Sequence, residues 1–357
     1  MHTRSRTLFF VALLLGLVLG PLDVPAQPVP DASWTRIETP SASGWSEEGL
    51  QEARAYSDSM GSAAVVVVHD GRIVDEWGEV ERTFKCHSIR KSFLSALYGI
   101  AVQRRTIDPS TTVGDLGVDD EPSLTEEEKT ATVRMLLKAR SGVYHDALYE
   151  TPAMEAARPE RGSHAPGTFW YYNNWDFNAL GTIYEQETGR TIHQAFEDLI
   201  AEPIDMQSYE ASDGSYVEGE DSIHPAYPFQ MTARDMARFG LLYLRGGRWN
   251  GTQVIPEFWI KESTVSYSGA DEAGGYGYLW WVSVDGQHFE DVDGVPFGTY
   301  TARGAGGHTI AVVPDLDLVL VHRTNTFEDR DIPYSQVGVL LKKILEAKNE
   351  WPNSPNF

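Results

Sequence analysis

Segments with the pattern of β-strands lie at both ends of this chain, and the stretch between them has the pattern of helices. Residues 63–68 are apolar and β-branched, Asp70 and Gly71 form a two-residue turn, and residues 72–77 return as a second strand. Residues 276–284 and the pair 309–313 and 318–322 are strand candidates near the other end. One sheet can contain both groups only if the residues between them form an inserted region. We therefore expect an α+β fold, an antiparallel sheet with a helical region at about 106–275 inserted in it.

Helices are expected on both flanks of this sheet. A helix begins after Ser46 and ends at Gly61, and apolar residues from Val337 to Leu345 recur at helical spacing near the C-terminus. Inside the inserted region, helical patterns cover residues 132–140, 178–186, 193–200 and 236–244. The sheet is thus predicted to be flanked by an N-terminal and a C-terminal helix.

The segment after the first hairpin combines a buried helix with a reactive pair of side chains. Phe93, Leu97 and Ile100 recur at helical spacing, and Ser88 and Lys91 stand one turn apart at its start. A neutral lysine amine can take the serine proton, and the helix N-terminus directs the Ser88 N–H toward a carbonyl oxygen. A Ser-x-x-Lys pair also arises by chance in a chain of 357 residues, as a surface pair on a helix. Its position at the start of a buried helix favours the catalytic interpretation.

Two further segments carry polar groups suited to catalysis. Tyr172 and Asn174 follow a Pro-Gly turn; a tyrosine hydroxyl can relay a proton, and an asparagine amide can hold a substrate amide. Glycines at 304, 306 and 307 lead into the strand at 309–313, where a backbone N–H can complete an oxyanion hole. The structural alternatives are an aromatic loop that packs the core and a glycine-rich hairpin turn.

Together, in this order, the three segments resemble those of the serine β-lactamase and penicillin-binding protein superfamily, over about residues 45–345. The resemblance is closest to the class C-like branch, which includes esterases and aminohexanoate-dimer hydrolases. It implies Ser88 as nucleophile, Lys91 as base and Tyr172 as proton relay, with Asn174 at the substrate. Many relatives have Lys-Thr-Gly or His-x-Gly in the third segment, where this chain has Gly304-Ala305-Gly306.

That departure limits what the resemblance implies for the third segment. Only a backbone role is carried over, with the Ala305 N–H as second oxyanion donor beside Gly304. Arg303 and His308 are the neighbouring side chains that could line the substrate site, Arg303 by restoring a cation.

Other chemistry is less well supported. Cys86 is the single cysteine, which excludes an intramolecular disulfide, and we expect a buried core residue rather than a thiol nucleophile. His145 and His164 lack the spacing of a metal motif, so no metal or cofactor is expected. The net charge of −23 disfavours nucleic acid and anionic lipid as partners.

The resemblance to the serine β-lactamase superfamily implies a small ester, amide or peptide-like substrate. A β-lactamase or DD-peptidase proper is one alternative. The other is a non-catalytic binding or sensor protein on the same fold.

The N-terminus has the pattern of a signal peptide. Arg4 and Arg6 precede an apolar run at 8–19, and small residues surround Ala26. We expect cleavage after Ala26 and export to the periplasm or medium; an uncleaved membrane anchor is the alternative. Residues 1–26 are then the signal peptide, 27–40 a linker and 41–350 the hydrolase domain.

Overall fold

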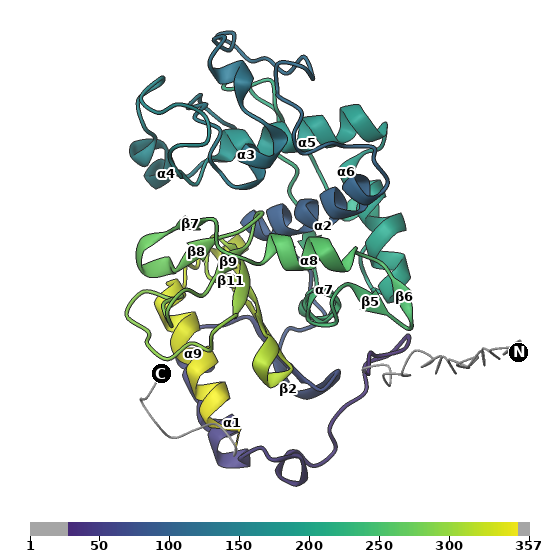
Figure 1. Cartoon of the computed structure of the whole chain (residues 1–357). Helices are drawn as coiled ribbons and strands as arrows, with labels where there is room; N and C mark the ends of the chain where they lie inside the picture. Colours follow the sequence, from purple (N-terminus) through teal and green to yellow (C-terminus); the bar gives the residue numbers. More distant parts are fainter. Residues whose placement is uncertain (1–27, 349–357) are drawn as a thin grey trace, which may run out of the picture.

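The computed structural model describes residues 28–348. Its main feature is an antiparallel sheet of order β2-β1-β12-β11-β10-β9-β8-β7 (Figure 1). The strands of this sheet are β1 (Ala64–His69), β2 (Arg72–Gly78), β7 (Ser268–Gly269), β8 (Gly275–Tyr276), β9 (Trp281–Val282), β10 (Tyr300–Gly304), β11 (His308–Val313) and β12 (Leu318–Arg323). Two short pairs join β3 (Phe84–Lys85) to β4 (Gln230–Met231) and β5 (Arg248–Trp249) to β6 (Thr252–Gln253).

The helices are α1 (Glu47–Met60), α2 (Arg90–Gln103), α3 (Val133–Leu137), α4 (Pro152–Ala157), α5 (Asn174–Thr188), α6 (Ile192–Phe196), α7 (Ala233–Leu244), α8 (Glu257–Ser263) and α9 (Tyr334–Glu346). Side chains of Ser46 and Thr232 cap α1 and α7 by accepting from backbone N–H groups. Both helices therefore begin where a polar N-cap residue precedes an apolar pattern.

The two ends of the chain meet in the middle of the sheet. Strand β1 pairs with β12, with Val66 opposite Val321, and with β2 through a turn at Asp70 and Gly71. Both turn residues have positive φ, 50° and 68°, as a tight hairpin turn requires. The predicted antiparallel sheet built from both ends of the chain is confirmed.

Alternating strand residues bury both faces of the sheet. One face, from β1, β11 and β12, packs against α1 and α9, which lie side by side in Figure 1. The other face packs against α7, and Gly240 of α7 lies so close to the sheet that a Cβ there would be 2.7 Å from Val319 Cγ1. The flanking N- and C-terminal helices predicted from the sequence thus share one face.

Helix α2 lies between the sheet and a helical region formed by α3, α4, α5 and α6, at the top of Figure 1. This region is inserted between β2 and β7, as predicted. Its expected boundary at 275 is too late, because α7 packs on the sheet and α8 packs on α2. The prediction of one continuous strand at 276–284 is also wrong. This segment is the short hairpin of β8 and β9, which bends at Leu279 with φ of 64°.

The segment predicted as a linker packs on the domain. Ile37 N–H donates to the Ile73 carbonyl at 2.9 Å, and Arg238 donates to the Asp31 carbonyl at 2.7 Å. The linker prediction is therefore wrong for the described residues 28–40. The predicted signal peptide lies outside the described residues. Within 28–348, no helix has the length and apolar character needed to cross a membrane.

Close packing of α8 on α2 generates a stability prediction. In Gly99→Ala, the new Cβ would lie 2.4 Å from Cγ of Trp259, so the indole must move. We expect the free energy of unfolding to fall by about 1–2 kcal/mol, since overpacking costs more than the gain in helix propensity. Chemical denaturation measures it. Gly269→Ala, with no atom within 4 Å of its Cβ, is the control and should change stability little. Equal stability of both variants would contradict this packing.

Candidate active site

The start of α2 brings Ser88 and Lys91 together. Ser88 lies in a short 3-10 turn, His87–Ile89, that leads directly into the helix. The Lys91 amine is 2.9 Å from the Ser88 hydroxyl oxygen. Lys91 is 1% exposed, whereas Ser88 is partly exposed. The geometry therefore offers a hydroxyl that a substrate can reach and an amine that solvent cannot.

Tyr172 completes this cluster from the helical region. Its hydroxyl oxygen is 2.8 Å from the Lys91 amine. Asn173 caps α5 through its side chain, which accepts from the Trp175 N–H at 3.1 Å. The cap fixes where the loop ends and thus where Tyr172 points. Of the predicted residues, Ser88, Lys91 and Tyr172 are the ones that the structure brings into direct contact.

Aromatic rings surround the amine of Lys91. The rings of Tyr172 and Phe177 have their centroids 4.2 Å and 4.5 Å from it. Trp281 stacks beside Tyr172, with centroids 5.3 Å apart. Sequence reasoning missed Trp281, which was hidden in a segment assigned to a continuous strand.

Burial determines whether the Lys91 amine or the Tyr172 hydroxyl holds the proton. It lowers the pKa of Lys91 well below its usual value, and the neighbouring charge of Arg90 adds to this effect. Burial also raises the pKa of Tyr172 to about 12. An ammonium–phenolate pair is therefore disfavoured on both sides. The proton stays on the tyrosine, and the lysine amine is free to act as a base.

Strand β10 places its end against the turn that carries Ser88. A Cβ on Gly304 would lie 2.4 Å from the Cys86 carbonyl oxygen, so a side chain there would displace the turn. Ala305 follows directly and is exposed in the turn between β10 and β11. Position 304 requires glycine because the two backbones approach closely there. This close approach also places Ala305 beside the serine turn.

Asn174 lies at the first position of α5 and faces the loop before α4. Its Nδ2 donates to the Tyr149 carbonyl at 2.7 Å. Its buried Oδ1 has no hydrogen-bond partner among the described residues. The side chain therefore holds this loop and keeps one acceptor free.

Arg303 and His308 lie next to the cluster, but their side chains are buried and held by other groups. The Arg303 guanidinium donates to the Thr301 hydroxyl and the His288 carbonyl and lies within 5.4 Å of the ring centroids of Trp281, Phe289 and Tyr334. His308 is fully buried and accepts from Arg323 at 2.9 Å. The expectation that both line the substrate site is not met, because the register of β10 and β11 turns both side chains into the protein.

His87 is a neighbour of the nucleophile that sequence reasoning missed. Its φ is 48°, a conformation that residues with a Cβ adopt at a cost. Its Nε2 is 2.9 Å from the Thr326 hydroxyl, and its ring stacks on that of Tyr149. No pattern in the sequence could reveal this backbone conformation.

Two tryptophans near the motifs in sequence and the cysteine belong to the core. Trp175 and Trp280 are fully buried, and the Trp175 indole donates to Asp120 at 2.7 Å. Cys86 is buried too, and burial raises the pKa of its thiol to about 12. A thiolate is therefore disfavoured beside Ser88. Within residues 28–348, no group of three or more histidine, cysteine, aspartate or glutamate side chains is arranged to hold a metal ion.

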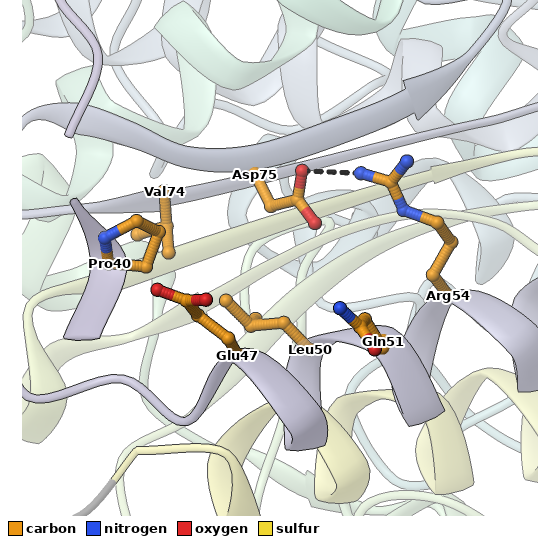
Figure 2. A pocket seen from close by; sticks show the side chains of 7 residues that line it. All are labelled: Pro40, Glu47, Leu50, Gln51, Arg54, Val74 and Asp75. Atoms are coloured by element: carbon orange, nitrogen blue, oxygen red, sulfur yellow. Dashed lines mark hydrogen bonds and ion pairs between the residues drawn. The ribbon is translucent and has the colours of Figure 1, made fainter. Parts of the chain in front are cut away.

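A separate depression lies on the other face of the sheet, between α1 and β2 (Figure 2). Arg54 and Asp75 form an ion pair of 2.7 Å across it, and Leu50 and Val74 line its floor. None of the predicted catalytic residues reaches it. The Ser88 cluster is therefore the candidate active site.

Comparison with known proteins agrees with this arrangement. The Beta-lactamase family model matches residues 48–337, so the chain belongs to that family. An uncharacterized protein from Alkalihalophilus pseudofirmus is 23% identical over 296 residues, which cover 74% of this chain and 84% of the relative.

Solved structures share the fold at low identity. "Putative 6-aminohexanoate-dimer hydrolase from Bacillus anthracis" is 22% identical, with a TM-score of 0.63 and coverage of 85% and 83% of the two chains. A penicillin binding protein from Bacillus halodurans is 17% identical, with a TM-score of 0.59 and coverage of 81% and 99%. EstCE1, a hydrolase with promiscuous acyltransferase activity, is 15% identical, with a TM-score of 0.59 and coverage of 85% and 98%. The superfamily and fold class expected from the sequence are confirmed.

The contact between Lys91 and Tyr172 predicts how a minimal change affects turnover. Tyr172→Phe removes only the hydroxyl and keeps the ring against Trp281. We expect turnover to drop by about a hundredfold or more, with the melting temperature nearly unchanged. Steady-state kinetics and thermal unfolding of the same preparation measure both.

Tyr171→Phe is the matched control. The Tyr171 hydroxyl donates to the Met154 carbonyl at 2.7 Å, away from Lys91. This variant should keep its activity. If it were the inactive one, the assignment of the relay would be off by one residue.

Proposed function

We propose that this protein is a serine hydrolase that acts on small esters or amides through an acyl-enzyme. The observation that carries the proposal is the contact of one buried lysine amine with both Ser88 and Tyr172. Burial lowers the pKa of Lys91 and so favours the neutral amine, which beside a hydroxyl that a substrate can reach suits activation of a nucleophile.

The reaction divides into two acyl transfers. Ser88 attacks the substrate carbonyl while Lys91 takes its proton. The N–H groups of Ser88 and Ala305 hold the oxyanion, and Tyr172 passes a proton to the leaving group. Water then attacks the ester of Ser88, and the same groups return the protons. Every step uses side chains or backbone of this chain and needs no cofactor.

The proposed preference for uncharged substrates follows from the lack of an available cation at Ala305. Ala305 stands where many relatives would hold a substrate carboxylate, and Arg303 is committed to the interior. Trp170 and Trp281, which pack against each other beside Tyr172, favour an apolar acyl group. Similarity to structures titled a putative 6-aminohexanoate-dimer hydrolase and a hydrolase with promiscuous acyltransferase activity also favours linear amides and esters.

A β-lactamase or DD-peptidase proper is the second candidate, since a penicillin binding protein shares the fold. A non-catalytic binding or sensor protein on the same fold is the third.

Covalent labelling tests the nucleophile and separates the enzyme from a sensor. A fluorophosphonate should modify a single peptide, the one that contains Ser88. Ser88→Ala should fold normally and lose both labelling and turnover. Labelling that persists in this variant, or that moves to Cys86, would refute the assignment. Labelling of the wild type without turnover of any substrate would favour the sensor.

A substrate panel tests the preference. We expect kcat/KM for p-nitrophenyl butyrate or an aminohexanoate dimer to exceed that for nitrocefin. Loss of a charge-assisted hydrogen bond to a carboxylate costs about 1.5–3 kcal/mol, or one to two decades in rate. All three substrates are assayed on one preparation. A nitrocefin value more than about tenfold above both others would identify a β-lactamase instead.

A further inference from the structure

Arg90, the residue before Lys91, is a buried cation without a counterion. Its side chain is fully buried in α2, and Nη2 donates to Asn178 Oδ1 at 2.8 Å. Its Nε and Nη1 have no hydrogen-bond partner among the described residues. No carboxylate of residues 28–348 lies within ion-pair distance of it. The guanidinium is held instead over the Tyr227 ring, 4.2 Å from the centroid.

Burial of an unpaired cation lowers the stability of the fold. Removing a cation from water without a partner carries a desolvation penalty of several kcal/mol. A neutral side chain of similar volume would fill the same space without that penalty. The charge itself is therefore the property that needs an explanation.

The charged side chains around Lys91 are Arg90 and the ion pair of Glu150 with Arg158. Arg90 comes from α2, and Glu150 follows Tyr149, whose ring lies 5.7 Å from the Arg90 guanidinium and whose carbonyl Asn174 holds. Glu150 pairs with Arg158, and its buried Oε1 has no hydrogen-bond partner within residues 28–348. The other close groups are uncharged: Ser88 from the serine turn, Tyr172 from the loop before α5 and Phe177 from α5, with Tyr276 of β8 packed against Tyr172. Asp176 lies further along α5, and burial raises its pKa well above the usual value.

We propose that Arg90 is a positioning residue whose unpaired charge keeps the Lys91 amine unprotonated. The inference rests on the proposed function, in which Lys91 is the base. Like charges in a dry environment repel strongly, so a fixed guanidinium favours the neutral amine. The direction of the Lys91 pKa, lowered by burial and by Arg90 and raised by Glu150, agrees with this geometry.

The test follows the rate of fluorophosphonate labelling of Ser88 between about pH 5 and pH 10. Labelling needs the unprotonated base, so its acidic limb reports the protonation of Lys91. Arg90→Gln removes the positive charge and raises the pKa of Lys91. The acidic limb should then move to higher pH by about one unit or more. Arg90→Lys keeps a cation and should restore the wild-type limb.

Asn178→Asp provides an independent variant that leaves Arg90 in place. The substitution is nearly isosteric and sets a carboxylate against the guanidinium at the 2.8 Å contact. Neutralised in this way, Arg90 should no longer favour the free amine, and the limb should move up as in Arg90→Gln. If Arg90→Gln does not fold, Asn178→Asp alone tests whether the charge of Arg90 lowers the pKa of Lys91.

The outcomes separate this inference from the proposed function. Ser88→Ala that is still labelled would refute the proposed function, whatever Arg90 does. If labelling depends on Ser88 but the limb stays in place in both Arg90→Gln and Asn178→Asp, Arg90 is only structural and the inference is wrong. A uniform loss of rate in Arg90→Gln that Arg90→Lys does not restore would lead to the same conclusion.

Discussion

The exclusion of water from one lysine amine is the condition on which the rest of this site depends. Lys91 can serve as a base only while its amine is uncharged, and a lysine in water is protonated at neutral pH. Helix α2 removes that water because every residue from Arg90 to Ala101 is buried between the sheet and the helical region. The layered architecture is thus part of the chemistry. A helix at the surface could present the same two side chains, but its lysine would stay charged.

The same burial explains why the site is assembled from separate parts of the chain. Ser88 comes from the 3-10 turn that leads into α2, Lys91 from α2 itself, Tyr172 from the loop before α5, and Gly304 from the end of β10. No single element could surround the amine and also leave the serine hydroxyl open. The sheet domain covers one side of the Lys91 amine and the helical region covers the other, and the cluster forms where these two parts meet. Packing between them therefore determines the 2.8 Å and 2.9 Å contacts of Lys91 as directly as the local helix geometry does.

The sequence was sufficient for the parts of this arrangement that depend on local periodicity. Apolar spacing in α2, the Asp70-Gly71 turn and the strand pattern of β11 and β12 each have a local cause, and each was predicted correctly. The failures share a different cause. Alternation along β10 predicts that Arg303 and Ala305 share a face, but not that Phe289 and Tyr334 cover the guanidinium. Trp175 and Trp280 are aromatic residues near the motif in sequence, yet their burial depends on which face of α5 or the sheet hairpin packs inward.

Unpaired polar atoms around the amine are a second kind of information that a sequence does not contain. Arg90 reads in the sequence as an ordinary helix residue between Ser88 and Lys91, where an exposed cation would be unremarkable. Among the residues that the structure describes, its guanidinium makes one side-chain hydrogen bond and packs on an aromatic ring, and two of its nitrogens have no hydrogen-bond partner. A buried neighbour of this kind changes the free energy of protonating Lys91 without touching a substrate. The reactive pair is visible as a motif, whereas the field that makes it reactive exists only once the chain has folded.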